Sequence, residues 1–201
     1  MHICYRQRIF TKQGLMVIFK ILATIIFILW LFYCKPISGI NNFKRFGMRV
    51  CSSAIKNGLI DDKYGKRGKN FKGDMPTISL PFSITEEPEG TVSYAIVLED
   101  EDAIPVVGYS WIHWMAANIT QKNIPENFSQ TAKNIVQGEN SWGVNAYGGM
   151  TPPDAPHRYD LHVYALDCLL DIKTGFNVAD LYRIMGEHIL DSYILSARYN
   201  N

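Results

Sequence analysis

The hydrophobic and polar positions of the chain follow three successive patterns. Residues 21–33 are thirteen apolar residues without a charge, and Lys20 alone separates them from a shorter apolar stretch at 15–19. Short apolar segments bounded by Gly, Pro, Asn and Asp follow. Near the C-terminus the apolar positions recur about every 3.6 residues. These patterns predict an apolar leader, a β-rich core and a C-terminal helix.

The apolar leader has the length of a signal-peptide core or of a marginal membrane span. Met16 is an alternative start, because Lys20 then provides a basic residue directly before the apolar run. The small residues Ser38 and Gly39 favour cleavage near Gly39. Lipidation at Cys34 is a weaker alternative, because large residues precede this cysteine.

The leader divides the chain into two parts. We expect residues 1–39 to be a signal peptide or an N-terminal membrane anchor, and residues 40–201 to be one domain, which is an ordinary size. The domain is then exported, either periplasmic or secreted, and meets a membrane only through the N-terminal segment. A net charge of +1 offers no broad basic surface, so nucleic acid is excluded as a partner.

Strand signals recur through the core. Segments rich in β-branched and aromatic residues lie at 48–55, 77–84, 91–98, 109–119 and 159–166. The intervening segment 56–74 is rich in Gly, Asp and Lys, which predicts a solvated loop. The core is therefore expected to be mainly β.

The helical pattern begins at Asn177. Val178, Leu181 and Met185 fall on one side of a helix, and Asn177 is a favourable N-cap residue. We expect a helix that continues or restarts through 191–199. Strands followed by helices predict a sheet structure with the helices packed at one end or face.

Two cysteines, Cys51 and Cys168, belong to the expected mature domain. In an oxidising compartment they could form a disulfide. Two buried free thiols are an equally good interpretation, because the sequence does not fix the distance between their Cα atoms. Both interpretations stay open at this point.

Three segments concentrate residues that could carry chemistry. The first, 98–105, places Asp100 and Asp102 in an acidic run at the end of an apolar strand, where scaffolds present binding groups. A solvated acidic turn is an equally good interpretation. In the second, strand alternation places His113 on one face with Trp111 and Met115. A lone strand histidine is usually a core residue, but His113 comes one strand after the acidic turn.

The third segment, 147–159, contains two glycines and three prolines and ends in His157, Arg158 and Tyr159. Its backbone amides, with imidazole and phenol donors, predict an anion cradle. In this hypothesis Asp100 lies behind His113, raises its pKa and keeps it cationic, while His157, Tyr159 and the loop backbone contact the anion.

At these segments the chain resembles the phosphatidylethanolamine-binding proteins, and within them the bacterial and archaeal branch described as Raf-kinase-inhibitor-like. The acidic turn of that family reads Asp-Pro-Asp-Ala-Pro, and residues 100–104 here read Asp-Glu-Asp-Ala-Ile. The family's Gly-x-x-Pro-Pro loop ending in His-Arg-Tyr is similar to residues 149–159. The likeness runs from about Val50 to Tyr199.

The resemblance implies an antiparallel β-sandwich with one or two C-terminal helices. It also implies non-enzymatic binding of a phosphate-like anion or a phospholipid head group, without cofactor or metal, and possible action on a partner protein. The ligand-binding residues that it implies are Asp100, Asp102, Trp111, His113, Gly149, His157 and Tyr159. Departures at Glu101 and Ile104 predict that Asp100 is held less firmly than in the family.

Two other functions remain as alternatives. A hydrolase could use Asp100, Asp102, His113 and His157 as metal ligands or as acid and base. A protease or kinase inhibitor module could use the pocket for docking. Binding is favoured because the expected domain contains neither a Gly-x-Ser-x-Gly elbow nor a Cys next to a His in the sequence.

Overall fold

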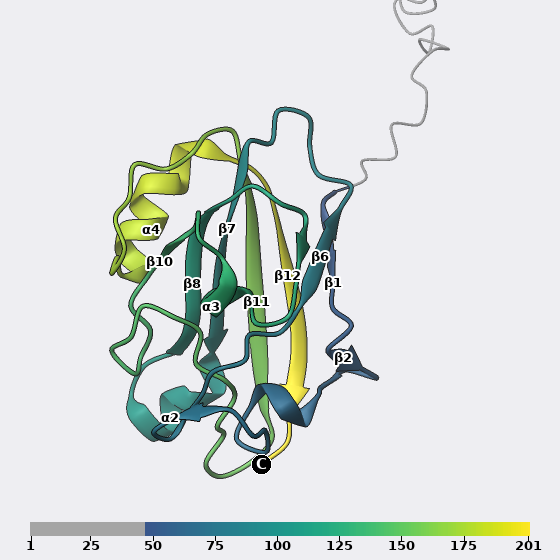
Figure 1. Cartoon of the computed structure of the whole chain (residues 1–201), viewed down its shortest axis with the longest axis vertical. Coiled ribbons are helices and arrows are strands. Elements are labelled where there is room, and N and C mark those ends of the chain that lie inside the picture. Colours follow the sequence, from purple (N-terminus) through teal and green to yellow (C-terminus); the bar gives the residue numbers. More distant parts are fainter. Residues whose placement is uncertain (1–46) are drawn as a thin grey trace, which may run out of the picture. The chain divides into compact units, whose positions relative to one another are not determined.

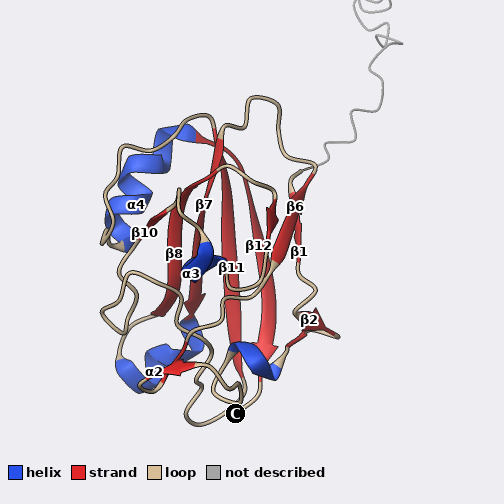
Figure 2. Cartoon of the chain, viewed as in Figure 1, coloured by secondary structure: helices blue, strands red, loops and turns tan. Residues whose placement is uncertain are grey.

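Long β-strands form the body of the protein. The computed structural model describes residues 47–201, and the leader expected at 1–39 lies outside them. Figures 1 and 2 show the strands running side by side, with the helices in the segments that connect them. The strands are β1 (Arg49–Cys51), β2 (Ile55–Lys56), β3 (Leu59–Ile60), β4 (Phe71–Lys72), β5 (Met75–Pro76), β6 (Phe82–Thr85), β7 (Ser93–Asp100), β8 (Trp111–Ile119), β9 (Asn123–Ile124), β10 (Val136–Gln137), β11 (His157–Leu166) and β12 (Ile189–Tyr199).

The helical segments are short. The α-helices are α2 (Ile104–Val107), α3 (Phe128–Thr131) and α4 (Val178–Met185), and the 3-10 turns are η1 (Asp62–Tyr64), η2 (Glu101–Ala103) and η3 (Gly186–His188). Asn177 caps α4 as predicted, because its side chain accepts a hydrogen bond of 2.9 Å from the backbone N–H of Asp180. Within residues 47–201 no helix is long and apolar enough to cross a membrane.

A seven-stranded sheet in the order β10-β8-β7-β11-β12-β3-β2 forms the larger layer, and a three-stranded sheet in the order β1-β6-β9 forms the smaller one. One apolar cluster lies between the two sheets and includes Ile96, Trp114 and Tyr159. A second cluster, with Val97 and Leu181, packs α4 against the other face of the large sheet. The predicted mainly β sandwich is confirmed, with one difference.

That difference concerns the strand directions. β12 pairs with β3 in parallel, through Arg198 and Leu59, whereas the other strand pairs of this sheet are antiparallel. The large sheet is therefore mixed. Central strand β7 reads Ser-Tyr-Ala-Ile-Val-Leu and is buried on both faces, because β8 and β11 flank it and apolar clusters cover both sides.

The helix predicted for 191–199 is wrong. This segment belongs to β12, which pairs with β11 from Ile189 to Tyr199. Tyr193, Leu195, Ala197 and Tyr199 alternate with more exposed residues, a period of two that suits a strand rather than a helix. Pairing along the whole length of β11 satisfies the backbone, so tertiary context decides the structure here.

Two further predictions need correction. The strand expected at 48–55 is split into β1 and β2, and that expected at 77–84 is reduced to β6. Cys51 and Cys168 are both free thiols, so the structure contains no disulfide between them. Neither is fully buried: Cys51 is exposed, with its Sγ 3.2 Å from Ser83 Oγ, and Cys168 is half-buried.

Candidate functional site

The candidate site lies where β7 ends and β11 begins, at the end of the large sheet next to α2 (Figure 1). Asp100 is the last residue of β7, and it pairs with Trp111 on β8. On the other side of β7, the antiparallel register with β11 brings His157 and Tyr159 to the same end of the sheet. Strand pairing therefore gathers residues that are up to 59 positions apart, from Asp100 to Tyr159.

A pocket of about 150 Å³ opens at this end of the sheet. Its walls are mostly apolar, with one carboxylate, one imidazole and one hydroxyl. The lining residues are Asp100, Ala103, Val106, Val107, Trp111, His113, Thr151 and Pro153. Of the predicted site residues, Asp100, Trp111 and His113 line the pocket, whereas Asp102, Gly149, His157 and Tyr159 lie outside its lining.

Asp100 is buried and fixed by two hydrogen bonds. Its Oδ1 accepts from the backbone N–H of Ala103 at 3.1 Å, and its Oδ2 accepts from Nδ1 of His157 at 2.8 Å. The departures at Glu101 and Ile104 do not loosen it, because η2 and α2 form there and the turn is capped by Asp100 itself. In this chain Asp100 is therefore held by the turn and by His157 despite these departures.

His157 lies between two carboxylates. Its Nδ1 donates to Asp100, and its Nε2 lies 2.9 Å from Oδ1 of the exposed Asp154. Burial disfavours the charged ring, but Asp100 and Asp154 together outweigh it and raise the pKa of His157. Both nitrogens face carboxylate acceptors, so the geometry favours the charged ring, which donates from both nitrogens.

His113 has the opposite character from the one predicted. Burial, only partly opposed by the Gly148 carbonyl and Asp100, lowers the pKa of His113 to about 4. The neutral ring places its proton on Nδ1, which lies 2.8 Å from the carbonyl oxygen of Gly148 and donates to it. Its Nε2 is then an acceptor. The Asp100 carboxylate therefore bonds to the imidazole of His157. His113 is neutral, not cationic as predicted.

The position of His113 also differs from simple strand alternation. β8 pairs Trp114 with Leu98 but Ile112 with Glu99, a register shift that falls at His113. Trp114 joins the cluster between the sheets, whereas Met115 packs under α4. The ring of His113 contacts Tyr159 on the side of the first cluster, at 5.1 Å between centroids, so it does not share a face with Met115.

The two glycines of the loop support the site by packing and do not offer their own amides to an anion. The N–H of Gly148 donates to the His113 carbonyl and the N–H of Gly149 to the Pro76 carbonyl, each at 2.8 Å. These amides are therefore not free for a ligand. Gly149 is needed for close packing, since a Cβ there would lie 2.2 Å from the carbonyl oxygen of Tyr64.

Two buried donors beside the site have no hydrogen-bond partner within residues 47–201. They are Nε1 of Trp111, in the pocket wall, and the hydroxyl of Tyr159. Burial, with a contribution from Asp100, raises the pKa of Tyr159, so its hydroxyl stays protonated. A buried donor without a partner costs about 1–3 kcal/mol, and such groups often mark places where a ligand or water binds.

Asp102 has a structural role. Its Oδ2 accepts a hydrogen bond of 2.8 Å from the backbone N–H of Arg158, which ties the acidic turn to the start of β11. The sequence reasoning missed Asp154 as the second partner of His157, and it missed the apolar pair Val106 and Val107. Asp154 could have been found from its position three residues before His157, but the valines carry no chemical signal.

The His157 ion pairs predict a pH-dependent stability. Because the folded protein raises the pKa above the ordinary value of about 6.5, the stabilisation is complete below about pH 6.5 and is lost as the pH rises through the folded pKa. Asp154→Asn removes one of the two carboxylates and should reduce this loss. Urea unfolding followed by tryptophan fluorescence at a series of pH values measures it.

The matched control for this series is Asp171→Asn, an exposed substitution that should leave the wild-type pH profile unchanged. Only the difference between the variant and wild-type profiles reports on His157. Equal pH profiles for Asp154→Asn and the wild type would contradict the assignment.

Gly149→Ala tests the close packing of the loop. We expect it to lower the free energy of unfolding by about 1–3 kcal/mol, because the new methyl group must displace the backbone at Tyr64. Gly186→Ala is the control: nothing lies within 4 Å of its Cβ position and its φ is −54°. That change should be neutral or stabilise by up to about 1 kcal/mol. Similar losses in both variants would argue against the packing role.

Comparison with known proteins identifies the family. A family model described as phosphatidylethanolamine-binding protein matches residues 51–200. The uncharacterized protein YxkA of Bacillus subtilis is 40% identical over 150 residues, which cover 67% of this chain and 89% of that protein. The crystal structure of CT736 from Chlamydia trachomatis, a homologue of these proteins, matches with a TM-score of 0.66 at 31% identity, over 77% of this chain and 98% of that one.

Escherichia coli YbcL, whose crystal structure is described as a new member of the mammalian PEBP family, has the same TM-score at 25% identity. It aligns with 77% of this chain and 99% of its own. The family model spans β1 to β12, including both motifs around the pocket. The chain belongs to the phosphatidylethanolamine-binding protein family.

Proposed function

We propose that the protein binds a small phosphate-like anion or a phospholipid head group, without catalysis, in the pocket beside Asp100. The observation that carries this proposal is the buried, unpartnered N–H of Trp111, a residue that lines the pocket together with the neutral His113. An indole N–H can only donate, so its partner must be an acceptor such as a phosphate oxygen. Family membership supports ligand binding in general.

The neutral His113 selects the protonation state of the anion. Its Nε2 accepts a hydrogen bond, so a phosphate that carries a proton can donate to it while another oxygen accepts from Trp111. A phosphate monoester loses its second proton with a pKa of about 6. A fully deprotonated anion binds only if His113 takes up a proton. For a phosphate monoester both routes require a proton, so its affinity falls as the pH rises above about 6.

The mouth of the pocket favours a ligand with an apolar part. Val106 and Val107 belong to the lining, and they are 50% and 39% exposed. Ile104 and Tyr109 extend this apolar rim and are 45% and 53% exposed. Free phosphate leaves this surface uncovered, whereas a phospholipid covers it with the glycerol and the first acyl carbons. The rim therefore supports a phospholipid head group over inorganic phosphate.

The geometry does not favour the hydrolase alternative. The carboxylate of Asp100 is used by Ala103 and His157, and that of Asp102 accepts from the Arg158 backbone. Both nitrogens of His157 bond carboxylates. His113 donates from Nδ1 to a backbone carbonyl, so it has no carboxylate to orient it as a base. Action on a partner protein, including inhibition, is an extension of the binding proposal and has no separate support in the pocket.

We also propose that residues 1–39 direct export of the domain or anchor it in a membrane, because the apolar run at 21–33 has the corresponding length. Expression of the full chain in a bacterium tests this. The expected result is a periplasmic or secreted protein whose N-terminus lies near residue 40, or an intact chain in the membrane fraction. Intact chain in the soluble cytoplasm would refute the proposal.

Trp111→Phe tests the binding proposal directly. This change keeps an aromatic wall, removes the N–H and shortens the ring, so affinity for phosphoethanolamine should fall at least about tenfold, the typical worth of a hydrogen bond to a charged group. Calorimetric titration at pH 6 and pH 8, with phosphate, phosphoethanolamine and a short-chain phosphatidylethanolamine, measures the fall. The phospholipid should bind most tightly. Phosphate and phosphoethanolamine, which become more fully deprotonated between pH 6 and pH 8, should bind more weakly at pH 8.

Trp142→Phe is the control for that titration. Its ring touches the edge of Trp111, at 5.1 Å between centroids, but it does not line the pocket, so binding should stay near the wild-type value. Absence of binding by all three compounds at millimolar concentration, or equal affinities for Trp111→Phe and the wild type, would refute the proposed site.

A further inference from the structure

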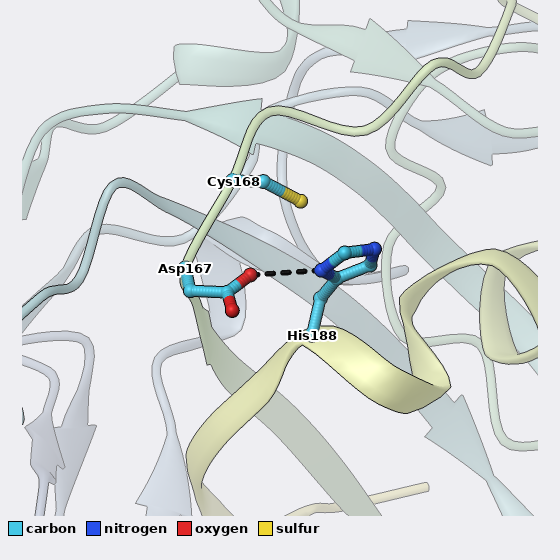
Figure 3. Close-up of side chains that lie close together, drawn as sticks. All are labelled: Asp167, Cys168 and His188. Carbon is cyan, nitrogen blue, oxygen red and sulfur yellow. Dashed lines mark hydrogen bonds and ion pairs between the residues drawn. The ribbon is translucent and has the colours of Figure 1, made fainter.

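A second group of polar side chains lies at the other end of β11. Asp167 and Cys168 follow the last residue of β11, and His188 ends η3 directly before β12. Figure 3 shows the carboxylate of Asp167 and the thiol of Cys168 pointing toward the imidazole of His188. Oδ1 of Asp167 lies 2.8 Å from Nδ1 of His188, and one possible ligand atom from each residue lies within 4.8 Å of the others.

This arrangement corrects an expectation from the sequence. No Cys stands next to a His along the expected domain, but the fold brings Cys168 beside His188, 20 positions away. From the sequence, Cys168 was considered only for a disulfide with Cys51, which does not form, and His188 was assigned no chemistry.

The backbone holds the three residues in place. Leu166 pairs with Ile189 at the end of the β11–β12 ladder, and the N–H of Asp167 donates to the carbonyl of His188 at 3.1 Å. A register shift next to Leu166 interrupts the regular pairing at this point. Such irregularities change the direction of nearby side chains. The cluster is therefore built on the ends of two long paired strands.

The cluster is separate from the pocket. β11 has ten residues from His157 to Leu166, and a strand rises about 3.3 Å per residue, so the two ends lie about 30 Å apart. None of Asp167, Cys168 and His188 takes part in the pocket or in the ion pairs behind it. Whatever binds at one end does not depend on contacts made at the other.

The cluster is reachable from solvent. The side chains of Asp167 and His188 are 47% and 44% exposed, and Cys168 is half-buried. We propose that Asp167, Cys168 and His188 bind a divalent transition metal ion of the zinc class, with a fourth position open to water or another ligand. Sulfur, imidazole nitrogen and carboxylate oxygen together suit Zn²⁺ and Co²⁺, whereas Ca²⁺ and Mg²⁺ take oxygen ligands.

The distances allow this coordination with small side-chain rotations. Zinc lies about 2.3 Å from sulfur and about 2.0–2.1 Å from nitrogen and oxygen, which puts tetrahedral ligand atoms about 3.3–3.6 Å apart. The three atoms already lie within 4.8 Å of one another. The metal takes the place of the proton between His188 and Asp167, which moves to Nε2 of the ring or to solvent, and the thiol of Cys168 loses its own proton to solvent.

A nucleophilic cysteine is the other chemistry that these residue types suggest. It needs a hydrogen bond between the thiol and the imidazole, but the hydrogen bond of His188 within residues 47–201 goes to Asp167. Burial, followed by the charge of Asp167, raises the pKa of the Cys168 thiol. The protein alone therefore keeps the sulfur protonated, whereas a bound metal ion would displace that proton.

Titration of the full chain, purified in mild detergent without chelator, tests the proposal. Calorimetry with Zn²⁺ should show one site that Cys168→Ser and His188→Gln each weaken about tenfold or more. Co²⁺ should give a thiolate-to-metal absorption band that is lost in Cys168→Ser. Cys51→Ser and His162→Gln are the matched controls, because Cys51 lies on β1 and His162 bonds Glu99, and both should bind like the wild type.

Circular dichroism and thermal melts of each variant establish that a loss of binding is not a loss of fold. The proposal is overturned if the wild type binds no Zn²⁺, if Cys168→Ser binds it as tightly as the wild type, or if the Co²⁺ band persists without Cys168. Binding of phosphoethanolamine is measured on the same samples. It should be equal in Cys168→Ser and the wild type, so failure at one site is distinguishable from failure at the other.

Discussion

The ion pair between Asp100 and His157 is the interaction on which the candidate site depends. It joins the end of β7 to the start of β11, and both side chains are almost completely buried. Removing two charges from water costs several kcal/mol per ion, so such a pair contributes little net stability. Removing one partner, however, leaves a buried charge uncompensated. The pair therefore fixes geometry: Asp100 cannot leave its position without exposing or neutralising His157.

The surrounding groups follow from this constraint. Asp100 also accepts from Ala103, which fixes the turn that leads into α2 and its apolar rim. Asp154 satisfies the second nitrogen of His157 and so ties the proline loop to the same pair. His113 is left with a backbone carbonyl as partner and is therefore neutral. The pocket thus has a charged network behind its wall and mostly uncharged groups at its surface.

The sequence located the strands that carry this site better than it located the contacts between their residues. Strand composition located β7, β8 and β11, and Asn177 located the start of α4, because those signals are local. β12 was missed because its alternation is partly polar and its stability comes from pairing with β11. The partner of Asp100 was wrongly predicted for a related reason. β7 has two neighbouring strands, and the order along the chain favoured His113 on β8. The Asp100 carboxylate bonds instead to His157 on β11.

The same strand also explains how one small domain can carry two independent sites. β11 lies between β7 and β12, and its side chains are held by pairing on both edges. Pairing on both edges fixes the residues just before and just after the strand. His157 opens the strand at the pocket, and Asp167 follows its last residue at the Cys168 and His188 cluster. His157 and Asp167 are close in the sequence, but the extended strand between them places the two sites about 30 Å apart.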